Sequence, residues 1–241
     1  MTYLQFHSLF NLPPLLLFLY LQKEHPPQLA EMLCLGLLFL AVGLFTSPWD
    51  NAAVKKGIWG FPDHQHRFKI NYLPIEEYLF FFIQTVLVIL STRWAYLTFP
   101  SLSLHLETTL TPLKGVMCLL LFLIWFFLGR SLHQKPLAPR WNYTVHLFLW
   151  FSPLILLQWI IGYELFAPRL PFLLLLSMAW GLYYTLCDLV ATAQGIWHFD
   201  SQQIHGTKIL NILPWEESAF FWITSLLVAQ SYILLLPASL R

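Results

Sequence analysis

Charged residues are scarce in this chain. Only 10% of its 241 residues are charged and 58% are hydrophobic, whereas about a quarter of the residues of a soluble domain usually carry charge. Such a chain cannot cover its surface with ionic groups, so most of that surface is expected to face lipid. The net charge of +1 and the scattered Lys and Arg residues provide no basic patch for nucleic acid. The composition indicates an integral membrane protein that does not bind nucleic acid.

Motifs for metals, nucleotides and serine hydrolysis are also missing. Cys34, Cys118 and Cys187 are isolated and lack the spacing of a zinc site. The sequence contains no GxGxxG, Walker loop, GxSxG or HExxH motif. A few loop histidines could be imagined as metal ligands beside Asp50 and Asp188, but they are not clustered as in membrane di-iron enzymes. These histidines are His64, His66, His198 and His205. We therefore expect no metal and no cofactor.

Long apolar runs dominate the chain instead. A membrane-spanning helix needs about 20 largely apolar residues, and about seven candidate helices of this kind occur. They lie near residues 3–22, 29–48, 73–92, 112–129, 143–162, 170–188 and 213–236. The first run lacks the basic start and the cleavage site of a signal peptide, so we expect it to be retained as a span. The stretches 49–72 and 189–212 are predicted to be polar loops. The expected fold class is an all-α membrane protein.

The two polar loops, with the start of the apolar run after each, repeat one another. Asp50, a Gly-Ile-Trp-x-Phe segment and a Leu-Pro-x-Glu-Glu-x-x-Phe-Phe segment recur in the same order in the second half. The repeat predicts two three-helix units joined by a linker helix. Because the linker restores the direction of the chain, the units are expected to be parallel, with both glutamate motifs on one face. The predicted regions are residues 1–111 (first repeat), 112–142 (linker helix and loop) and 143–241 (second repeat). Lys and Arg are more frequent on the side that bears the N-terminus, which predicts a cytoplasmic N-terminus by the positive-inside rule.

The paired glutamates are the main functional candidates. In "LPIEE" (residues 73–77) and "LPWEE" (213–217) they could simply start a helix, where acidic residues complement the helix dipole. The apolar run after the first pair, 78–91, is however too short to cross a bilayer at 1.5 Å per residue, which predicts that Glu76 and Glu77 lie within the membrane. Carboxyl groups at such depth usually face the protein interior and serve a function. In apolar surroundings, next to a second carboxylate, a carboxyl group tends to keep its proton, as a general acid must.

These motifs resemble the membrane-embedded lycopene β-cyclases. The resemblance rests on "PWDN" (48–51), on "GxWxF" (57–61) and on "LPxEExxFF" (73–81), and it covers residues 30–236. That family includes paired small subunits, fused chains and cyclase domains of fungal bifunctional enzymes. The second copy differs, with "CDLVAT" in place of "PWDNAAV", which leaves open whether Asp188 shares the role of Asp50. The resemblance implies cyclisation of the ends of lycopene, through γ-carotene, to the β-rings of β-carotene.

The implied acid–base groups are the four motif glutamates and one aspartate. We expect Glu76 and Glu216 to be the leading acid–base pair, with Glu77, Glu217 and Asp50 in support. Aromatic side chains could stabilise a carbocation, and the candidates are Trp59, Trp197, Phe80, Phe81, Phe220 and Phe221.

The expected partners are a lipophilic carotenoid, the lipid bilayer and other enzymes of carotenoid synthesis. The expected location is a cell membrane of bacterial type. Two alternatives stay open at this point. One is cyclisation of another acyclic carotenoid. The other is transport by a three-plus-one-plus-three arrangement of helices.

Overall fold

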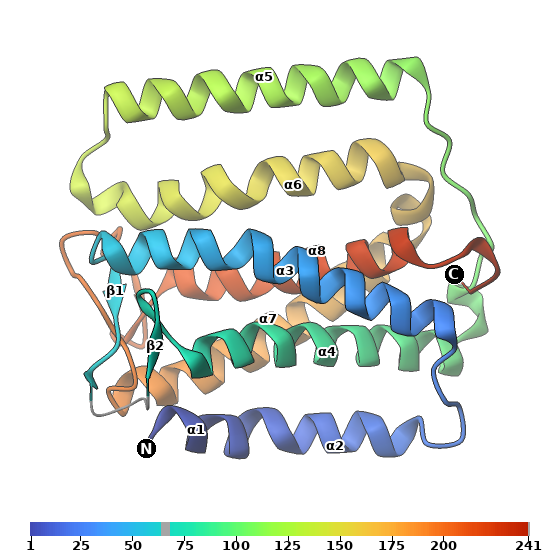
Figure 1. The fold of residues 1–241 in the computed structure, drawn as a ribbon, viewed down its shortest axis with the longest axis horizontal. Coiled ribbons are helices and arrows are strands. Elements are labelled where there is room, and N and C mark those ends of the chain that lie inside the picture. Colours follow the sequence, from blue (N-terminus) through green and yellow to red (C-terminus); the bar gives the residue numbers. More distant parts are fainter. Residues whose placement is uncertain (64–67, 241) are drawn as a thin grey trace.

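The computed structural model describes residues 1–63 and 68–240, and most of them are helical. The long helices lie side by side along one axis (Figure 1). The helices are α1 (Tyr3–Phe6), α2 (Leu12–Leu21), α3 (Leu29–Lys55), α4 (Ile75–Thr98), α5 (Pro112–Gln134), α6 (Asn142–Phe166), α7 (Leu170–Ala193) and α8 (Trp215–Leu235). A short π-helical segment, His7–Asn11, joins α1 to α2 without a break. The expected all-helical class is therefore confirmed.

Six helical stretches of the described residues are long and apolar enough to cross a membrane. They are Tyr3–Leu21, Leu29–Lys55, Ile75–Thr98, Pro112–Gln134, Pro139–Ala193 and Trp215–Leu235. The fifth stretch has 55 residues and includes both α6 and α7, which a single 3-10 turn separates. Because these stretches expose many leucines and phenylalanines, their outer surface suits lipid rather than water.

Two predicted boundaries are wrong in a way that affects the site. Helix α3 continues to Lys55 and α7 to Ala193, so Asp50 and its counterpart Asp188 lie in the last turns of helices. Asp50 is therefore not in the loop predicted for residues 49–72. Helix α4 has 24 residues and continues past Arg93, so the argument from a short apolar run does not hold.

An ion pair explains why Arg93 can be buried inside α4. Its Nε donates to Oε1 of Glu31 at 2.6 Å, and its Nη1 donates to the side-chain oxygen of Gln22 at 2.9 Å. A buried guanidinium is tolerated when it is paired and hydrogen-bonded. The helix can therefore run on past the charged residue that seemed to end its apolar run.

Short strands organise one end of the bundle. Strand β1 (Trp59–Gly60) pairs antiparallel with β4 (His198–Phe199), and so joins the two loops to each other. Two further pairs, β2 (Lys69–Ile70) with β3 (Leu73–Pro74) and β5 (Lys208–Ile209) with β6 (Leu213–Pro214), lead into α4 and α8. All of these strands and the N-terminus lie at the end of the bundle shown on the left of Figure 1. Both glutamate motifs therefore start from one end of the fold.

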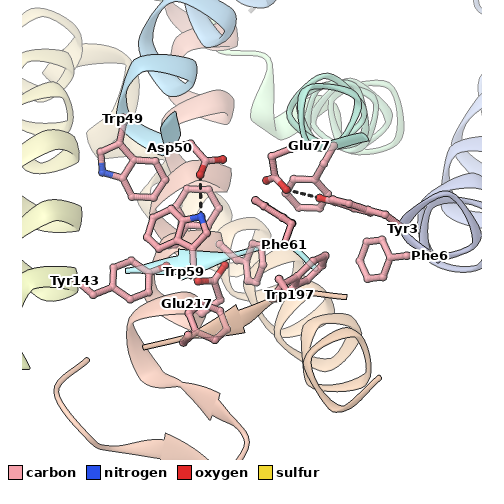
Figure 2. Close-up of a pocket in the computed structure, with 14 residues that line it drawn as sticks. Tyr3, Phe6, Trp49, Asp50, Trp59, Phe61, Glu77, Tyr143, Trp197 and Glu217 are labelled. Carbon is pink, nitrogen blue, oxygen red and sulfur yellow. Dashed lines mark hydrogen bonds between the residues drawn. The ribbon is translucent and has the colours of Figure 1, made fainter. Parts of the chain in front are cut away.

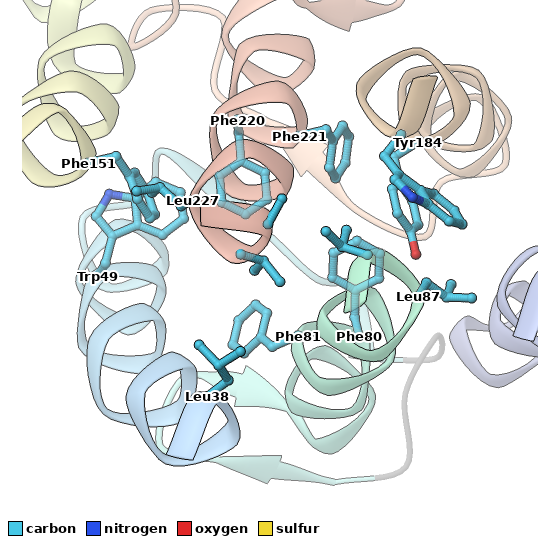
Figure 3. Packing of buried hydrophobic residues seen from close by; sticks show 14 of the residues in the cluster. Leu38, Trp49, Phe80, Phe81, Leu87, Phe151, Tyr184, Phe220, Phe221 and Leu227 are labelled. Carbon is cyan, nitrogen blue, oxygen red and sulfur yellow. The ribbon is translucent and has the colours of Figure 1, made fainter. Parts of the chain in front are cut away.

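Helices α4 and α8 form the centre of the bundle. Helix α8 packs against α4, α6 and α7, and α4 packs against α2 and α3. Phenylalanines from α4 and α8 meet Tyr184 of α7 and Trp49 of α3 in one buried cluster (Figure 3). Helix α5 lies at the outside against α6 and buries none of its residues. The aromatic centre of the core thus lies beside the starts of the two glutamate helices.

Candidate active site

A small pocket of about 40 Å³ lies where the two glutamate helices begin, under the paired strands (Figure 2). Three carboxyl groups and eleven aromatic rings line it. These residues are Tyr3, Phe6, Trp49, Asp50, Trp59, Phe61, Glu77, Phe80, Tyr143, Trp197, Phe199, Glu217, Phe220 and Phe221. We call this the acidic pocket. Its walls are aromatic and its polar groups are few, as in sites that bind small apolar molecules.

Glu77 is held by a phenol and faces a second acid. The hydroxyl of Tyr3 donates to Oε2 of Glu77 at 2.6 Å, and the Asp50 carboxyl lines the same pocket. The indole N–H of Trp59 donates to Oδ1 of Asp50 at 2.9 Å. Two carboxyl groups, each oriented by an aromatic hydrogen-bond donor, therefore share one pocket.

Glu217 has an equivalent setting on the opposite helix. It accepts a hydrogen bond from the hydroxyl of Tyr143, and the sequence separation of 74 residues equals that between Tyr3 and Glu77. The Trp59 ring lies 4.9 Å from the Tyr143 ring, and the Trp197 ring lies 5.2 Å from that of Tyr3. Each half of the chain therefore covers the phenol of the other half with its tryptophan.

The other two motif glutamates do not line the acidic pocket. Oε1 of Glu216 accepts hydrogen bonds from the Thr144 hydroxyl and from the backbone N–H of His205, both at 2.9 Å. It thereby fastens the loop to α6 and α8. The Glu76 side chain is also buried, and its backbone carbonyl accepts a 2.9 Å hydrogen bond from His7. Adjacent residues on a helix point about 100° apart, so Glu76 and Glu216 cannot face the pocket when their neighbours do.

Asp188 occupies the position in α7 that Asp50 occupies in α3. It is 1% exposed, and it does not line the acidic pocket. The hydroxyl of Thr192 reaches it only at 3.4 Å. The two halves thus supply similar acids, but only the first half presents its aspartate to the pocket.

Five of the six predicted aromatic residues line the acidic pocket: Trp59, Trp197, Phe80, Phe220 and Phe221. The sixth, Phe81, is buried but lies outside the pocket. Trp49 was not predicted to act; it stacks on Phe220 at 5.2 Å with an interplanar angle of 9°. Tyr3 and Tyr143 were also not predicted as site residues. Their equal sequence separation from Glu77 and Glu217 is the pattern from which they could have been predicted.

The histidines considered as metal ligands do not gather at this site. Among the described residues, no three His, Cys, Asp or Glu side chains are grouped so that they could hold a metal ion. His198 and His205 are exposed in the second loop, and His64 and His66 lie outside the described residues.

In the loop that contains His198 and His205, hydrogen bonds from the Gln202 amide and the Gln203 side chain lower the pKa of Asp200. That aspartate fastens the loop, since its own amide donates to the carbonyl of Ile58 at 2.9 Å.

Comparisons with known proteins point in one direction. No family model matches the chain, and no solved structure matches it. The chain is 31% identical to the bifunctional lycopene cyclase/phytoene synthase of Sporisorium reilianum, over 96% of this chain and 34% of that protein. It is 28% identical to the lycopene beta-cyclase of Halobacterium salinarum, over 83% of this chain and 80% of that protein. It spans about a third of the length of the bifunctional fungal relatives.

The apolar helices and the buried acidic pocket define a helical membrane protein with carboxyl groups enclosed among aromatic rings. Over most of its length the chain is similar to proteins named for lycopene cyclisation, so it resembles the lycopene cyclase family.

Proposed function

We propose that this protein is a lycopene β-cyclase, which closes the linear ends of lycopene into β-rings by acid–base catalysis. The names of the relatives support this activity. The observation that carries the mechanism is that Glu77 and Glu217 share one aromatic-lined pocket with Asp50. The product series would run from lycopene through γ-carotene to β-carotene. The reaction is an isomerisation, so atoms and electrons balance without an oxidant or a reductant.

The chemistry has three requirements. An acid adds a proton to the terminal double bond, and this gives a tertiary carbocation. A neighbouring double bond in the same end group then attacks that cation and closes a six-membered ring, which moves the positive charge onto a ring carbon. A base finally removes a ring proton and restores a double bond. Water must stay out, because it would capture either cation.

We assign the acid–base work to Glu77, Glu217 and Asp50 rather than to Glu76 and Glu216. The first three line the acidic pocket, whereas the Glu216 carboxyl is already occupied by Thr144 and by the loop backbone. The protonated member of the Asp50–Glu77 pair would protonate the alkene, and Glu217 would accept the ring proton. The phenols of Tyr3 and Tyr143 would hold the two glutamates in position.

The aromatic walls would stabilise the cationic intermediates. Ring faces attract positive charge, more strongly in a site without water. Trp59, Trp197, Phe80, Phe220 and Phe221 surround the carboxyl groups. Tryptophan and phenylalanine cannot accept a proton or add to the cation as a carboxylate or water would, so the charge would persist until the base acts.

In the membrane, we propose seven spans in two parallel three-helix repeats with α5 as the linker. The repeats would comprise residues 1–111 and 143–241, with 112–142 between them and the N-terminus in the cytoplasm. Paired contacts support this arrangement: the Tyr3–Glu77 bond has the same separation as Tyr143–Glu217, and Gln84 donates to Thr224 at 3.0 Å across a separation of 140 residues. We further propose a cell membrane of bacterial type and contact with other carotenoid-synthesising enzymes. The names of the relatives do not favour transport or another carotenoid substrate.

A pigment assay tests the function. The full chain is expressed in a bacterial host that accumulates lycopene, and the carotenoids are separated by chromatography. We expect the red cells to turn orange-yellow as cyclic products replace lycopene. Unchanged lycopene, with the protein present in the membrane fraction, would rule out this activity.

A further inference from the structure

A second cavity, larger than the acidic pocket, opens between α3, α4, α6 and α8. Its volume is about 390 Å³, within the range of small-molecule sites. Its lining residues are Leu38, Ala41, Val42, Leu44, Phe45, Thr46, Phe81, Gln84, Thr85, Phe151, Leu154, Phe220, Thr224, Leu227, Val228 and Ser231. We call it the groove. Figure 3 shows Leu38, Phe81, Phe151 and Leu227 around this part of the core.

The groove meets the acidic pocket at one ring. Phe220 lines both cavities, and Phe151 of the groove packs edge-on against Phe220 and against Trp49 of the pocket, with ring centroids 5.9 and 4.9 Å apart. From Phe220 the groove extends along α8 to Ser231, a length of about 16 Å at 1.5 Å per residue. An elongated molecule with one end in the pocket would therefore continue along the groove.

The surface of the groove suits an apolar occupant. Four of its five polar side chains make hydrogen bonds within the protein: Gln84 donates to Thr224 at 3.0 Å, and Thr85 donates to the Phe81 carbonyl at 2.8 Å. Ser231 accepts a 2.6 Å hydrogen bond from Gln158. Groups that are already bonded gain nothing from a polar ligand. Apart from Thr46, the remaining lining is aliphatic or aromatic, and none of the lining residues is charged.

The corresponding positions of the other half carry larger side chains. Val42 and Thr46 of α3 line the groove, whereas the equivalent positions of α7 carry Trp180 and Tyr184. Tyr184 is fully buried; it stacks on Phe221 at 5.5 Å and meets Phe80 edge-on at 5.3 Å. A cavity also lies between α2, α4 and α7, but it shares no lining residue with the acidic pocket. Of these two cavities, only the groove therefore shares a lining residue with the acidic pocket.

We propose that the groove is the binding site for the polyene chain of the substrate, with one end group in the acidic pocket and the rest of the molecule in contact with α3, α4, α6 and α8. This proposal rests on the proposed cyclase function. It adds that the two halves are unequal: both contribute acids, but substrate enters along the α3 side only. The path follows α3 because Val42 and Thr46 are small there, whereas the equivalent residues of α7, Trp180 and Tyr184, are large.

A matched pair of substitutions tests the groove. Ala41 lines the groove and Ala179 lines the cavity beside α7, at equivalent positions of α3 and α7, and both are exposed. Each would be changed to Trp in the full chain. Purified protein in detergent would be loaded with lycopene, and the pigment retained per protein and the rate of conversion would be measured. We expect Ala41→Trp to lower both at least about tenfold, since small steric changes in apolar sites have effects of this size. Ala179→Trp should match the parent.

The outcomes separate this proposal from the proposed function. Equal retention and conversion in both variants, or equal losses in both, would overturn the groove proposal while leaving the cyclase activity standing. If the parent retains lycopene without converting it, and only Ala41→Trp reduces retention, the groove proposal stands and the proposed cyclase function fails.

A second pair of variants would be measured if Ala41→Trp loses its cooperative thermal unfolding. This pair is Leu44→Trp in the groove and Leu182→Trp outside it. Both of these leucines are more than half exposed, so substitution should leave the core intact, and equal behaviour of this pair would again overturn the proposal.

Discussion

The Tyr3 hydroxyl lies 2.6 Å from Oε2 of Glu77 and donates a hydrogen bond to it. Tyr143 makes the same bond to Glu217 at the same sequence separation. The phenols lie at the starts of α1 and α6, and the carboxyl groups lie in the first turns of α4 and α8. The bonds therefore fix two helix starts and two carboxyl orientations together. A hydroxyl that holds a reacting carboxyl in this way affects the rate without itself touching the reacting carbon.

Removal of these hydroxyls tests that positioning role. We expect Tyr3→Phe and Tyr143→Phe each to lower kcat about 10- to 100-fold, since a lost hydrogen bond to a charged or proton-sharing group is worth about 1.5–3 kcal/mol. KM for lycopene should change little, because the ring remains. Tyr232→Phe is the matched control: it removes a buried hydroxyl that donates to Glu31 at the other end of the bundle. A loss of activity in this control as large as in the other two would argue for general destabilisation.

The Trp59–Asp50 hydrogen bond yields a second prediction. Trp59→Phe keeps an aromatic wall but removes the 2.9 Å donor to Asp50, so the Asp50 carboxyl should be less well oriented and the rate should fall about tenfold. Asp50→Asn should cost more, about 100-fold, because it removes the acid itself. Asp188→Asn should have the smaller effect, since Asp188 does not line the pocket. Initial rates of lycopene loss in membranes measure all three, and an Asp188→Asn defect equal to that of Asp50→Asn would contradict this ranking.

The Arg93–Glu31 ion pair should contribute to stability rather than to chemistry. The side chains are 9% and 12% exposed and lie far from the acidic pocket along α4. Arg93→Ala leaves the Glu31 carboxylate buried without its partner, which should cost about 3–5 kcal/mol and lower Tm. Lys23→Ala removes one side of an exposed pair with Glu24 at 3.9 Å and should change Tm little. Thermal unfolding in detergent distinguishes the two, and similar Tm values for both variants would show that the buried pair contributes little.

Close packing of α7 on α8 yields a further prediction about stability. A Cβ atom added at Gly181 would lie 1.9 Å from Cδ1 of Trp222, so Gly181→Ala must displace that ring. Overpacking of this kind typically costs about 1–3 kcal/mol. Gly115→Ala in α5 meets no atom within 4 Å and should be neutral or stabilising by up to about 1 kcal/mol. Only Gly181→Ala should therefore lower Tm, and a matching decrease in both variants would show that the contact with Trp222 is not the cause.

Much of the fold followed from the sequence because hydrophobic length is a local property. The apolar runs located the helices, and the repeated motif located the two glutamate pairs. The ends of α3 and α7 were placed too early because the polar residues around Asp50 and Asp188 suggested loops. In the structure these residues face the protein interior, so the helices continue. A composition window cannot distinguish a polar residue that faces the interior from one in water.

The choice between neighbouring glutamates could not be made from the sequence. Glu76 and Glu77 are both plausible acids, and their directions on the helix differ by about 100°. Which one faces the pocket depends on the rotation of α4. That rotation is set by distant contacts, such as the His7 bond to the Glu76 carbonyl and the Tyr3 bond to Glu77. Likewise, the pairing of β1 with β4 joins segments with no local signal in common apart from the repeat.

The most direct test compares neighbouring glutamates in one assay. Glu77→Gln, Glu217→Gln and Glu216→Gln would be expressed at matched levels in lycopene-accumulating cells, and the initial rate of cyclic carotenoid formation would be measured. The account predicts a fall of about 100- to 10,000-fold for Glu77→Gln and Glu217→Gln, since each removes a group that transfers a proton. Glu216→Gln keeps its hydrogen-bonding oxygen and should stay within about tenfold of the parent. Parental rates in Glu77→Gln and Glu217→Gln would contradict the account.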